Sequence, residues 1–530
     1  MRKTVYFLFF TAVFLLIWNT EIANRTEAED AFAYAWQVEH LPYYQLWHPH
    51  HLLYGPVARG IYDGAGWLGY RGRAYPLLRL LSALCGAGAV LMFFRFCCRR
   101  FSMRPVSSLL CSGLLLFSYG FWRYANEAEV YIPACFIMLC AIYLAVHPRQ
   151  TAAQAAWAGI LCGVSVLFHV LNIVPVFLAV PLFYLFHRNG TGLLIHLLSA
   201  GAVVLAGYLG VFYVESVQLF SSAAVLPAFS WNALIKGGVG FSQCVVSANF
   251  MLGYQTIRDA LVTLFPTRML LEELYLGACL PRWLVFGASV SFALLAGCFA
   301  GVTACALRLI FSRGDQRLWR DRVGTAEAWR TLIAVSLWFG GYAGALLLLE
   351  PGNPEVWVMG LVPFWLAFCG LIAAPLSRRN ALWPVLLLTV LLAFHNGLGG
   401  MLPLKNPQAD YNRQKAEWVL LHAGPDDTVL TAGNPVFERY LRYYCSAQVE
   451  DLYLWNEDQL AHSAEILQEI QLKHSPGTLY LLGDIFRQPV SLTKRFPEKT
   501  AAIARFAAQI RPFAVKIHED SFGGVYSLPD

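Results

Sequence analysis

Residues 283–308 read WLVFGASVSFALLAGCFAGVTACALR, and the single charged residue in this stretch is Arg308 at its end. A helix rises about 1.5 Å per residue, so roughly 20 apolar residues cross the hydrocarbon core of a bilayer. Residues 330–349 have the same character, with Arg330 as their one charged residue. Of all 530 residues, 57% are hydrophobic and 14% are charged, whereas soluble domains have about 25% charged residues. The sequence therefore excludes a soluble enzyme and predicts a polytopic membrane protein.

Eleven segments have this apolar character, and each is predicted to be a transmembrane helix. The first follows Met1, Arg2 and Lys3 and lacks a small-residue cleavage site, so it is predicted to be a retained anchor and not a signal peptide. The predicted fold class is an all-α polytopic membrane protein with about eleven transmembrane helices. The segments lie near 4–19, 77–97, 106–122, 130–147, 153–169, 171–187, 193–214, 283–308, 330–349, 356–376 and 381–398.

Arginine residues mark alternate connections between these segments, and positive residues favour the cytoplasmic side of a membrane. With the N-terminus inside, an odd number of spans places the residues after 400 outside the cytoplasm. The acidic residues agree, because only Asp315, Asp321 and Glu327 of the 17 before position 401 fall on the cytoplasmic side. Longer outer loops explain part of this difference. The cytoplasmic connections contain Arg99, Arg100, Arg104, Arg149, Arg188, Arg313, Arg317, Arg320, Arg322, Arg378 and Arg379.

Two domains are predicted. Residues 1–400 form the transmembrane domain, with long outer loops at about 20–76 and 215–282. The second loop is semi-apolar and is predicted to lie along the membrane surface. Sixteen of the 33 acidic residues fall within 401–530, which distinguishes this region from the rest of the chain. Residues 405–530 are predicted to form a small soluble extracytoplasmic α/β domain, with strands at 428–431 and 478–482 and helices at 435–444 and 459–473.

The 13 cysteines lie mostly within apolar segments, where a thiol behaves as a small hydrophobic group. They include no C-x-x-C pair, so neither a disulfide scaffold nor a structural metal site is expected. The net charge of +6 is small for a chain of this length. Nothing in the sequence indicates a nucleic-acid partner.

Three carboxylates, Glu27, Glu29 and Asp30, directly follow the first span. Carboxylates this close repel one another, and such a group is suited to act as a base or to bind a cation or hydroxyl groups. The alternative is a solvated helix N-terminus, where acidic residues are favourable. The sequence alone leaves both interpretations open.

Three histidines, His48, His50 and His51, surround Pro49 further along the same loop. Hydrogen bonding to a phosphate or a sugar is the favoured interpretation. A metal site is a weaker alternative, because adjacent histidines rarely share one ion. The other alternative is a purely structural loop packed by hydrogen-bonded histidines.

A polar stretch, FWRYANEAEVY at 121–131, separates two apolar segments. Ionisable residues at membrane depth indicate function by default. Arg123 is a candidate for binding a phosphate, while Glu127 and Glu129 are candidates for binding a cation or hydroxyl groups, with Tyr131 beside them. The alternative is an intramembrane Arg–Glu pair that fixes packing.

Two weaker candidates lie later in the chain. Glu350, Asn353 and Glu355 surround a rigid turn beside a tryptophan, an arrangement suited to sugar binding. Lys236 precedes a glycine-rich stretch whose backbone amides are suited to an anion.

Taken together, the acidic motif, the His-Pro element and the Phe-Trp…Glu-Val-Tyr element resemble the protein O-mannosyltransferase-related families of the GT-C superfamily of membrane glycosyltransferases. The similarity is strongest over about 20–145 and does not cover the C-terminal domain. The usual His-Pro-Pro-Gly of these families is replaced here by His-Pro-His-His. The resemblance implies a GT-C-like fold and transfer of a sugar from a polyprenyl-phosphate donor with inversion.

The resemblance also implies roles for individual residues. Asp30 is the first candidate for the base that activates the acceptor, with Glu29 second and Glu27 in support. His48 and His51 would face the donor phosphate or the acceptor, and Arg123 and Glu129 would line the same cavity. A divalent cation is possible but no dedicated metal site is expected. The acceptor would be a glycan, lipid or protein outside a bacterial inner membrane.

Two other function classes fit many spans with charged residues: a lipid-sugar flippase or transporter, and a non-catalytic subunit of an envelope complex. Transporters usually contain internal repeats and broken helices at the membrane midplane. This sequence shows no internal repeat, and its acidic residues gather on one side. A glycosyltransferase is therefore the favoured interpretation.

Overall fold

The computed structural model describes most of the chain. Its described residues divide into two compact units. The first contains the described residues up to Ile22 and from Gln37 to Lys405, and the second contains Ala23, 29–36 and the described residues from Asn406 on. The described residues are 2–23, 29–147, 150–221, 282–311, 326–349, 354–373, 382–407, 410–433, 435–455, 459–460, 477–488, 497–520 and 523–528.

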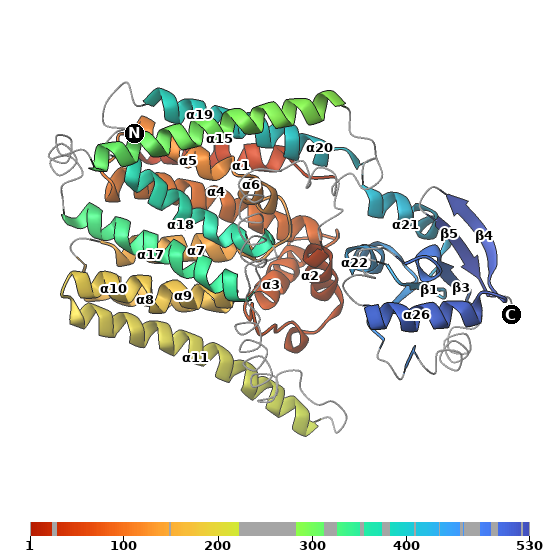
Figure 1. Cartoon of the computed structure of the whole chain (residues 1–530). Coiled ribbons are helices and arrows are strands. Elements are labelled where there is room, and N and C mark those ends of the chain that lie inside the picture. Colours follow the sequence, from red (N-terminus) through yellow and green to blue (C-terminus); the bar gives the residue numbers. More distant parts are fainter. Residues whose placement is uncertain are drawn as a thin grey trace. The chain divides into compact units, whose positions relative to one another are not determined.

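The first unit is helical, and its long helices lie side by side (Figure 1). One helix, α2, extends across the division between the two units, which falls after Trp36. The elements are α1 Arg2–Asn19, α2 Glu29–His40, η1 Tyr43–Gln45, α3 Tyr54–Trp67, α4 Tyr75–Arg100, α5 Pro105–Leu116, α6 Tyr119–Tyr124, α7 Tyr131–Ala145, α8 Ala152–Phe168, η2 Val170–Asn172, α9 Ile173–Phe177, α10 Ala179–Phe186, α11 Gly190–Ser221, α15 Arg282–Phe311, α17 Ala326–Leu349, α18 Pro354–Ile372, α19 Leu382–Asn396, η5 Gly397–Met401 and α20 Leu402–Leu404.

Within the described residues, five helices are long and apolar enough to cross a membrane: Tyr75–Arg100, Gly190–Val211, Ser289–Arg308, Glu355–Ile372 and Leu382–Met401. Five further apolar helices of 10–17 residues include α5, α7 and α8. The chain is thus an integral membrane protein by the length and composition of its helices.

The expected count of about eleven spans is not confirmed. The segment predicted at 106–122 is divided, because the backbone of Ser118 is extended between α5 and α6. The segment predicted at 171–187 is divided into η2, α9 and α10. A run of apolar residues has the same hydropathy whether its helix is continuous or interrupted, so hydropathy alone does not reveal these breaks.

Small residues allow two of the apolar helices to approach closely. A Cβ atom at Gly159 of α8 would lie 2.4 Å from the carbonyl oxygen of His196 on α11. A Cβ at Gly163, one turn later, would lie 2.7 Å from the Cβ of Val203. Such small residues at a helix–helix interface are typical of membrane proteins, where close packing drives association.

The second unit contains a five-stranded sheet of order β2-β1-β3-β5-β4. Strand β1 is parallel to both β2 and β3, while β5 is antiparallel to β3 and β4. The elements are β1 Thr428–Thr431, β2 Gln448–Asp451, β3 Leu479–Leu482, β4 Val515–Asp520 and β5 Gly523–Ser527, with α21 Tyr411–His422, α22 Pro435–Tyr444, η7 Gly483–Ile485 and α26 Pro497–Ile510. The predicted strands at 428–431 and 478–482 and the predicted helix at 435–444 are present, whereas most of 459–473 lies outside the described residues.

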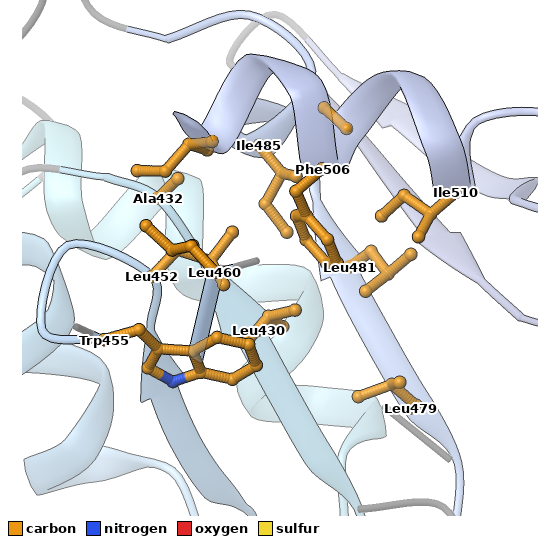
Figure 2. Close-up of a cluster of buried hydrophobic side chains, with 12 residues drawn as sticks. Leu430, Ala432, Leu452, Trp455, Leu460, Leu479, Leu481, Ile485, Phe506 and Ile510 are labelled. Atoms are coloured by element: carbon orange, nitrogen blue, oxygen red, sulfur yellow. The ribbon is translucent and has the colours of Figure 1, made fainter. Parts of the chain in front are cut away.

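The core of this sheet is apolar. Figure 2 shows Leu430 of β1 and Leu481 of β3 beside Phe506 and Ile510 of α26, with the indole of Trp455 nearby. Leu430 and Leu481 are fully buried. Burial of such side chains stabilises a domain by about 1.5–3 kcal/mol each, so this core holds α26 against the sheet.

Candidate functional site

A turn of buried charged residues joins α6 to α7. The Nε of Arg123 donates to Oε1 of Glu127 at 3.0 Å, and its Nη1 donates to the hydroxyl of Tyr119 at 3.4 Å. Arg123 is 3% exposed, and Glu127 and Glu129 are each 1% exposed. A buried charge is unfavourable unless it is paired and hydrogen-bonded, so the Arg123–Glu127 pair accounts for two of the three charges.

The second carboxylate oxygen of Glu127 is buried and has no hydrogen-bond partner within the described part of the chain. An ionised carboxylate accepts hydrogen bonds at both oxygens. A buried acceptor left unsatisfied costs about 1–3 kcal/mol. Glu127 therefore has capacity to accept a hydrogen bond from a bound molecule.

The histidines at 48–51 lie in a loop fastened to the end of α8. The carbonyl oxygen of His50 accepts from the backbone N–H of Val170 at 2.8 Å, and the N–H of Leu53 donates to the carbonyl of Leu167 at 2.9 Å. The hydroxyl of Tyr208 on α11 donates to the carbonyl of Pro49 at 3.0 Å. These three hydrogen bonds hold the loop beside the C-terminal end of α8.

The imidazoles of this loop pack against one another. His48 and His51 stack with their centroids 4.0 Å apart, and His48 and His50 meet edge to face at 5.3 Å. Burial, and then the neighbouring His48, His169 and His50, lower the pKa of His51 to about 2. His51 is therefore neutral at physiological pH. A neutral imidazole can donate to or accept from a hydroxyl group, but it offers no positive charge to a phosphate.

His169, at the end of α8, connects the histidine loop to the charged turn. Its ring lies 5.4 Å from the ring of Tyr131, the first residue of α7. Tyr131 in turn packs edge to face on Tyr124 at 5.8 Å. Glu355, in the first turn of α18, is close enough to Tyr124 for its charge to act on the phenol. The first unit thus brings several predicted residues into one polar cluster: His48, His50, His51, Arg123, Glu127, Glu129, Tyr131 and Glu355.

Asp30 lies in the second unit, at the start of α2, where it forms an ion pair with Arg439 of α22. Both side chains are about one third exposed, at 35% and 31%. The backbone of Glu29 belongs to α2, while its side chain is outside the described atoms. Glu27, Lys236, Glu350 and Asn353 lie outside the described residues.

Comparison with known proteins shows what this chain resembles. No family model and no curated protein matches the sequence. The structure of ArnT from Cupriavidus metallidurans bound to undecaprenyl phosphate is similar over 99% of this chain and 98% of that chain, with a TM-score of 0.50 and 14% sequence identity. The chain shares the fold of ArnT. The apo structure of ArnT gives the same values, and the apo oligosaccharyltransferase of Archaeoglobus fulgidus matches over 99% of this chain with a TM-score of 0.49 and 12% identity.

The likeness to ArnT agrees with the expectation of a mostly helical membrane protein with a small C-terminal α/β domain. It covers the helical unit and the C-terminal sheet, because the alignment extends over nearly the whole of both chains. The finer resemblance to the protein O-mannosyltransferase-related families is not confirmed.

Two residues, one in each unit, were missed by the sequence analysis. His169 falls inside the predicted span 153–169, and Arg439 falls inside the predicted helix 435–444. His169 and Asn172 are polar residues at the junction of two apolar segments, and that pattern was available in the sequence. Arg439 had no comparable local pattern.

The polar cluster combines groups with different binding chemistry. A guanidinium is a planar donor suited to phosphate oxygens, while carboxylates and neutral imidazoles hydrogen-bond to hydroxyl groups. Among the described residues, no group of three or more His, Cys, Asp or Glu side chains has a geometry that holds a metal ion. The arrangement is suited to a ligand that carries both a phosphate and hydroxyl groups.

Proposed function

We propose that this protein is a membrane glycosyltransferase that moves a sugar from a polyprenyl-phosphate donor to an acceptor hydroxyl. The observation that carries the proposal is the likeness to ArnT over 98–99% of both chains, in a structure of that protein with undecaprenyl phosphate bound. A fold by itself supports many functions. The proposal therefore also depends on the chemistry of the polar cluster.

Arg123 is the proposed contact of the donor phosphate. Its guanidinium stabilises the negative charge that develops on the leaving phosphate, which is the kind of interaction that contributes most to many enzymatic rates. Glu127, Glu129 and Glu355 accept hydrogen bonds from sugar hydroxyls. The neutral His51, with His48 and His50, exchanges hydrogen bonds with the sugar or the acceptor.

Asp30 is the proposed general base, with Glu29 as the second candidate and Glu27 in support. The acceptor oxygen forms a bond to the anomeric carbon while the bond from that carbon to the phosphate oxygen breaks. The acceptor proton passes to the carboxylate, and the lipid phosphate leaves with the bonding electrons. Attack from the side opposite the phosphate inverts the anomeric centre.

The proposed setting is a bacterial inner membrane with the reaction on the outer side. The concentration of arginine in alternate connections supports this orientation. A donor attached to a lipid diffuses in the membrane plane, so a transferase that uses it must be embedded in the same membrane.

A binding assay and a transfer assay together test the proposal. Undecaprenyl phosphate should raise the Tm of the detergent-solubilised protein, whereas undecaprenol, which lacks the phosphate, should not. Purified protein in liposomes, supplied with an extract of envelope glycans, lipids and proteins as acceptors, should release lipid phosphate from a panel of radiolabelled polyprenyl-phosphate sugars. Movement of labelled donor across the bilayer without its cleavage would instead identify a lipid-sugar transporter.

A further inference from the structure

The second unit includes a segment from near the other end of the sequence. Its residues 29–36 come from the loop after the first apolar helix, and the remaining described residues, apart from Ala23, start at Asn406. Several described contacts of 29–36 are made with one short helix, α22. We refer to them as the α2–α22 interface, formed by Asp30, Phe32 and Trp36 of α2 and by Arg439, Tyr440, Arg442, Tyr443 and Tyr444 of α22.

Aromatic rings form the centre of this interface. Phe32 is completely buried. Its ring lies 5.3 Å from that of Tyr440, 5.8 Å from that of Tyr443 and 5.6 Å from that of Tyr444. Edge-to-face aromatic pairs contribute beyond the burial of their area. The pairs with Tyr440 and Tyr444 have this edge-to-face geometry, and together with Tyr443 these rings surround Phe32 and fix the position of α2 on α22.

The ends of the interface are charged. Arg439 forms the ion pair with Asp30, and the guanidinium of Arg442 lies 5.8 Å from the ring centre of Trp36. Arg442 is itself held by Glu438 at 2.6 Å, one turn earlier in α22. Asp30 thus lies on a helix fixed by packing and is additionally held by a cation from the C-terminal domain.

We propose that the C-terminal domain holds the base of the transfer reaction in place, with Arg439 as the positioning residue for Asp30. This inference deepens the proposed function and rests on it for the role of Asp30. A base must hold its geometry closely, because a displacement of about 1 Å can lower a rate by about a hundredfold. Arg439 limits the rotamers of Asp30 without entering the reaction.

The first experiment tests the interface without reference to activity. Tm is measured for full-length protein carrying Asp30→Arg, Arg439→Asp and the double exchange. Each single change leaves two like charges together, and the double exchange restores an ion pair. We expect the double variant to recover at least half of the summed Tm losses. Additive Tm losses would overturn the Asp30–Arg439 contact, since the effects of substitutions at residues that do not interact are additive.

The second experiment tests the positioning role through kcat and KM. Arg439→Gln should lower kcat about 10- to 100-fold with the donor KM unchanged, and Arg439→Lys should restore much of kcat. In an Asp30→Asn background, Arg439→Gln should have no further effect. The matched control is Arg505→Gln, which removes an exposed arginine of α26 in the same domain.

The outcomes separate the two proposals. A normal kcat in Arg439→Gln, or a further loss in the Asp30→Asn background, would overturn the positioning role. Absence of transfer by the unaltered protein with every donor would overturn the proposed function, and the Tm exchange would still decide whether Asp30 and Arg439 interact.

Discussion

The ring of His169 lies 5.4 Å from the ring of Tyr131, and this contact joins two motifs that are far apart in the sequence. His169 neighbours the histidine loop at 48–51, and Tyr131 ends the charged stretch at 121–131. The pair places the imidazoles of this loop near a buried Arg–Glu pair. A ligand with a phosphate and several hydroxyl groups matches this combination.

Loss of the Arg123 guanidinium should weaken the binding of lipid phosphate. A hydrogen bond to a charged group contributes about 1.5–3 kcal/mol, so Arg123→Gln should raise the Kd for undecaprenyl phosphate about 10- to 150-fold. Titration of the detergent-solubilised protein measures the change. Arg71→Gln, at an exposed arginine of the first outer loop, should leave the Kd unchanged.

Arg123→Gln also leaves Glu127 without its buried partner, so folding must be checked separately. The variant Arg123→Gln/Glu127→Gln removes both charges and should recover the Tm without recovering phosphate binding. Recovery of binding in this double variant would show that Arg123 fixes packing and does not contact the phosphate.

Asp30→Asn should abolish most transfer while the donor still binds. General base catalysis contributes about 10²- to 10⁴-fold to a rate, and asparagine preserves the size of the side chain but cannot accept the proton. Single-turnover transfer and undecaprenyl phosphate binding measure the two effects. Asp426→Asn, at an exposed turn of the C-terminal domain, is the control. If Glu29→Gln is inactive and Asp30→Asn is active, the base is one residue earlier.

The orientation in the membrane predicts that the C-terminal domain is outside the cytoplasm. A cysteine introduced at the exposed Asp426 should react with a membrane-impermeant maleimide in intact spheroplasts, above the background of the unaltered chain. Reaction only after the inner membrane is permeabilised would reverse the orientation. The proposed side of the reaction would then be reversed as well.

One buried carboxyl group should give the C-terminal domain a pH-dependent stability. Burial raises the pKa of Asp451 to about 7, although the N–H of Tyr453 donates to it. The ordinary value is 3.8, so between about pH 4 and 7 the folded domain retains a proton that the unfolded chain has lost. The contribution of Asp451 to stability is therefore present at low pH and decreases as the pH rises to about 7.

Asp451→Asn removes this titration. The stability of the variant relative to the unaltered protein should increase from pH 5 to pH 8, by up to about 1.4 kcal/mol per pH unit below pH 7. Hydrogen exchange of β1, β2 and β3 in the full-length protein, corrected for intrinsic rates, measures the difference. Equal differences at both pH values would contradict the prediction.

Local patterns predicted the elements well. The segment expected at 381–398 contains α19, and the helix expected at 435–444 is α22 at the same bounds. Apolar run length and helical periodicity depend on neighbouring residues only. Both properties are determined by a stretch of about 20 residues, so a single sequence reveals them.

Long-range contacts were not predictable in the same way. Asp30 and Arg439 are 409 positions apart, and nothing near either residue indicates its partner. The membership of 29–36 in the C-terminal unit depends on the packing of Phe32 among tyrosines of α22. The breaks after Leu116 and Phe177 also depend on local backbone conformation inside runs that remain apolar throughout.

Strand β4 lies at one end of the sheet, and its Val515 and Ile517 are 54% and 43% exposed. A terminal strand offers backbone groups on which a strand from another molecule can add. Lys516 lies between these two apolar residues, and Glu519 follows them. The two side chains form a 3.0 Å ion pair, which adds charge to the same strand. Charged side chains on an edge strand oppose such addition, and salt screens their charge. Detergent-solubilised protein should therefore remain monodisperse at low salt and form larger assemblies as the salt concentration rises, which sets the conditions for concentrating and storing it.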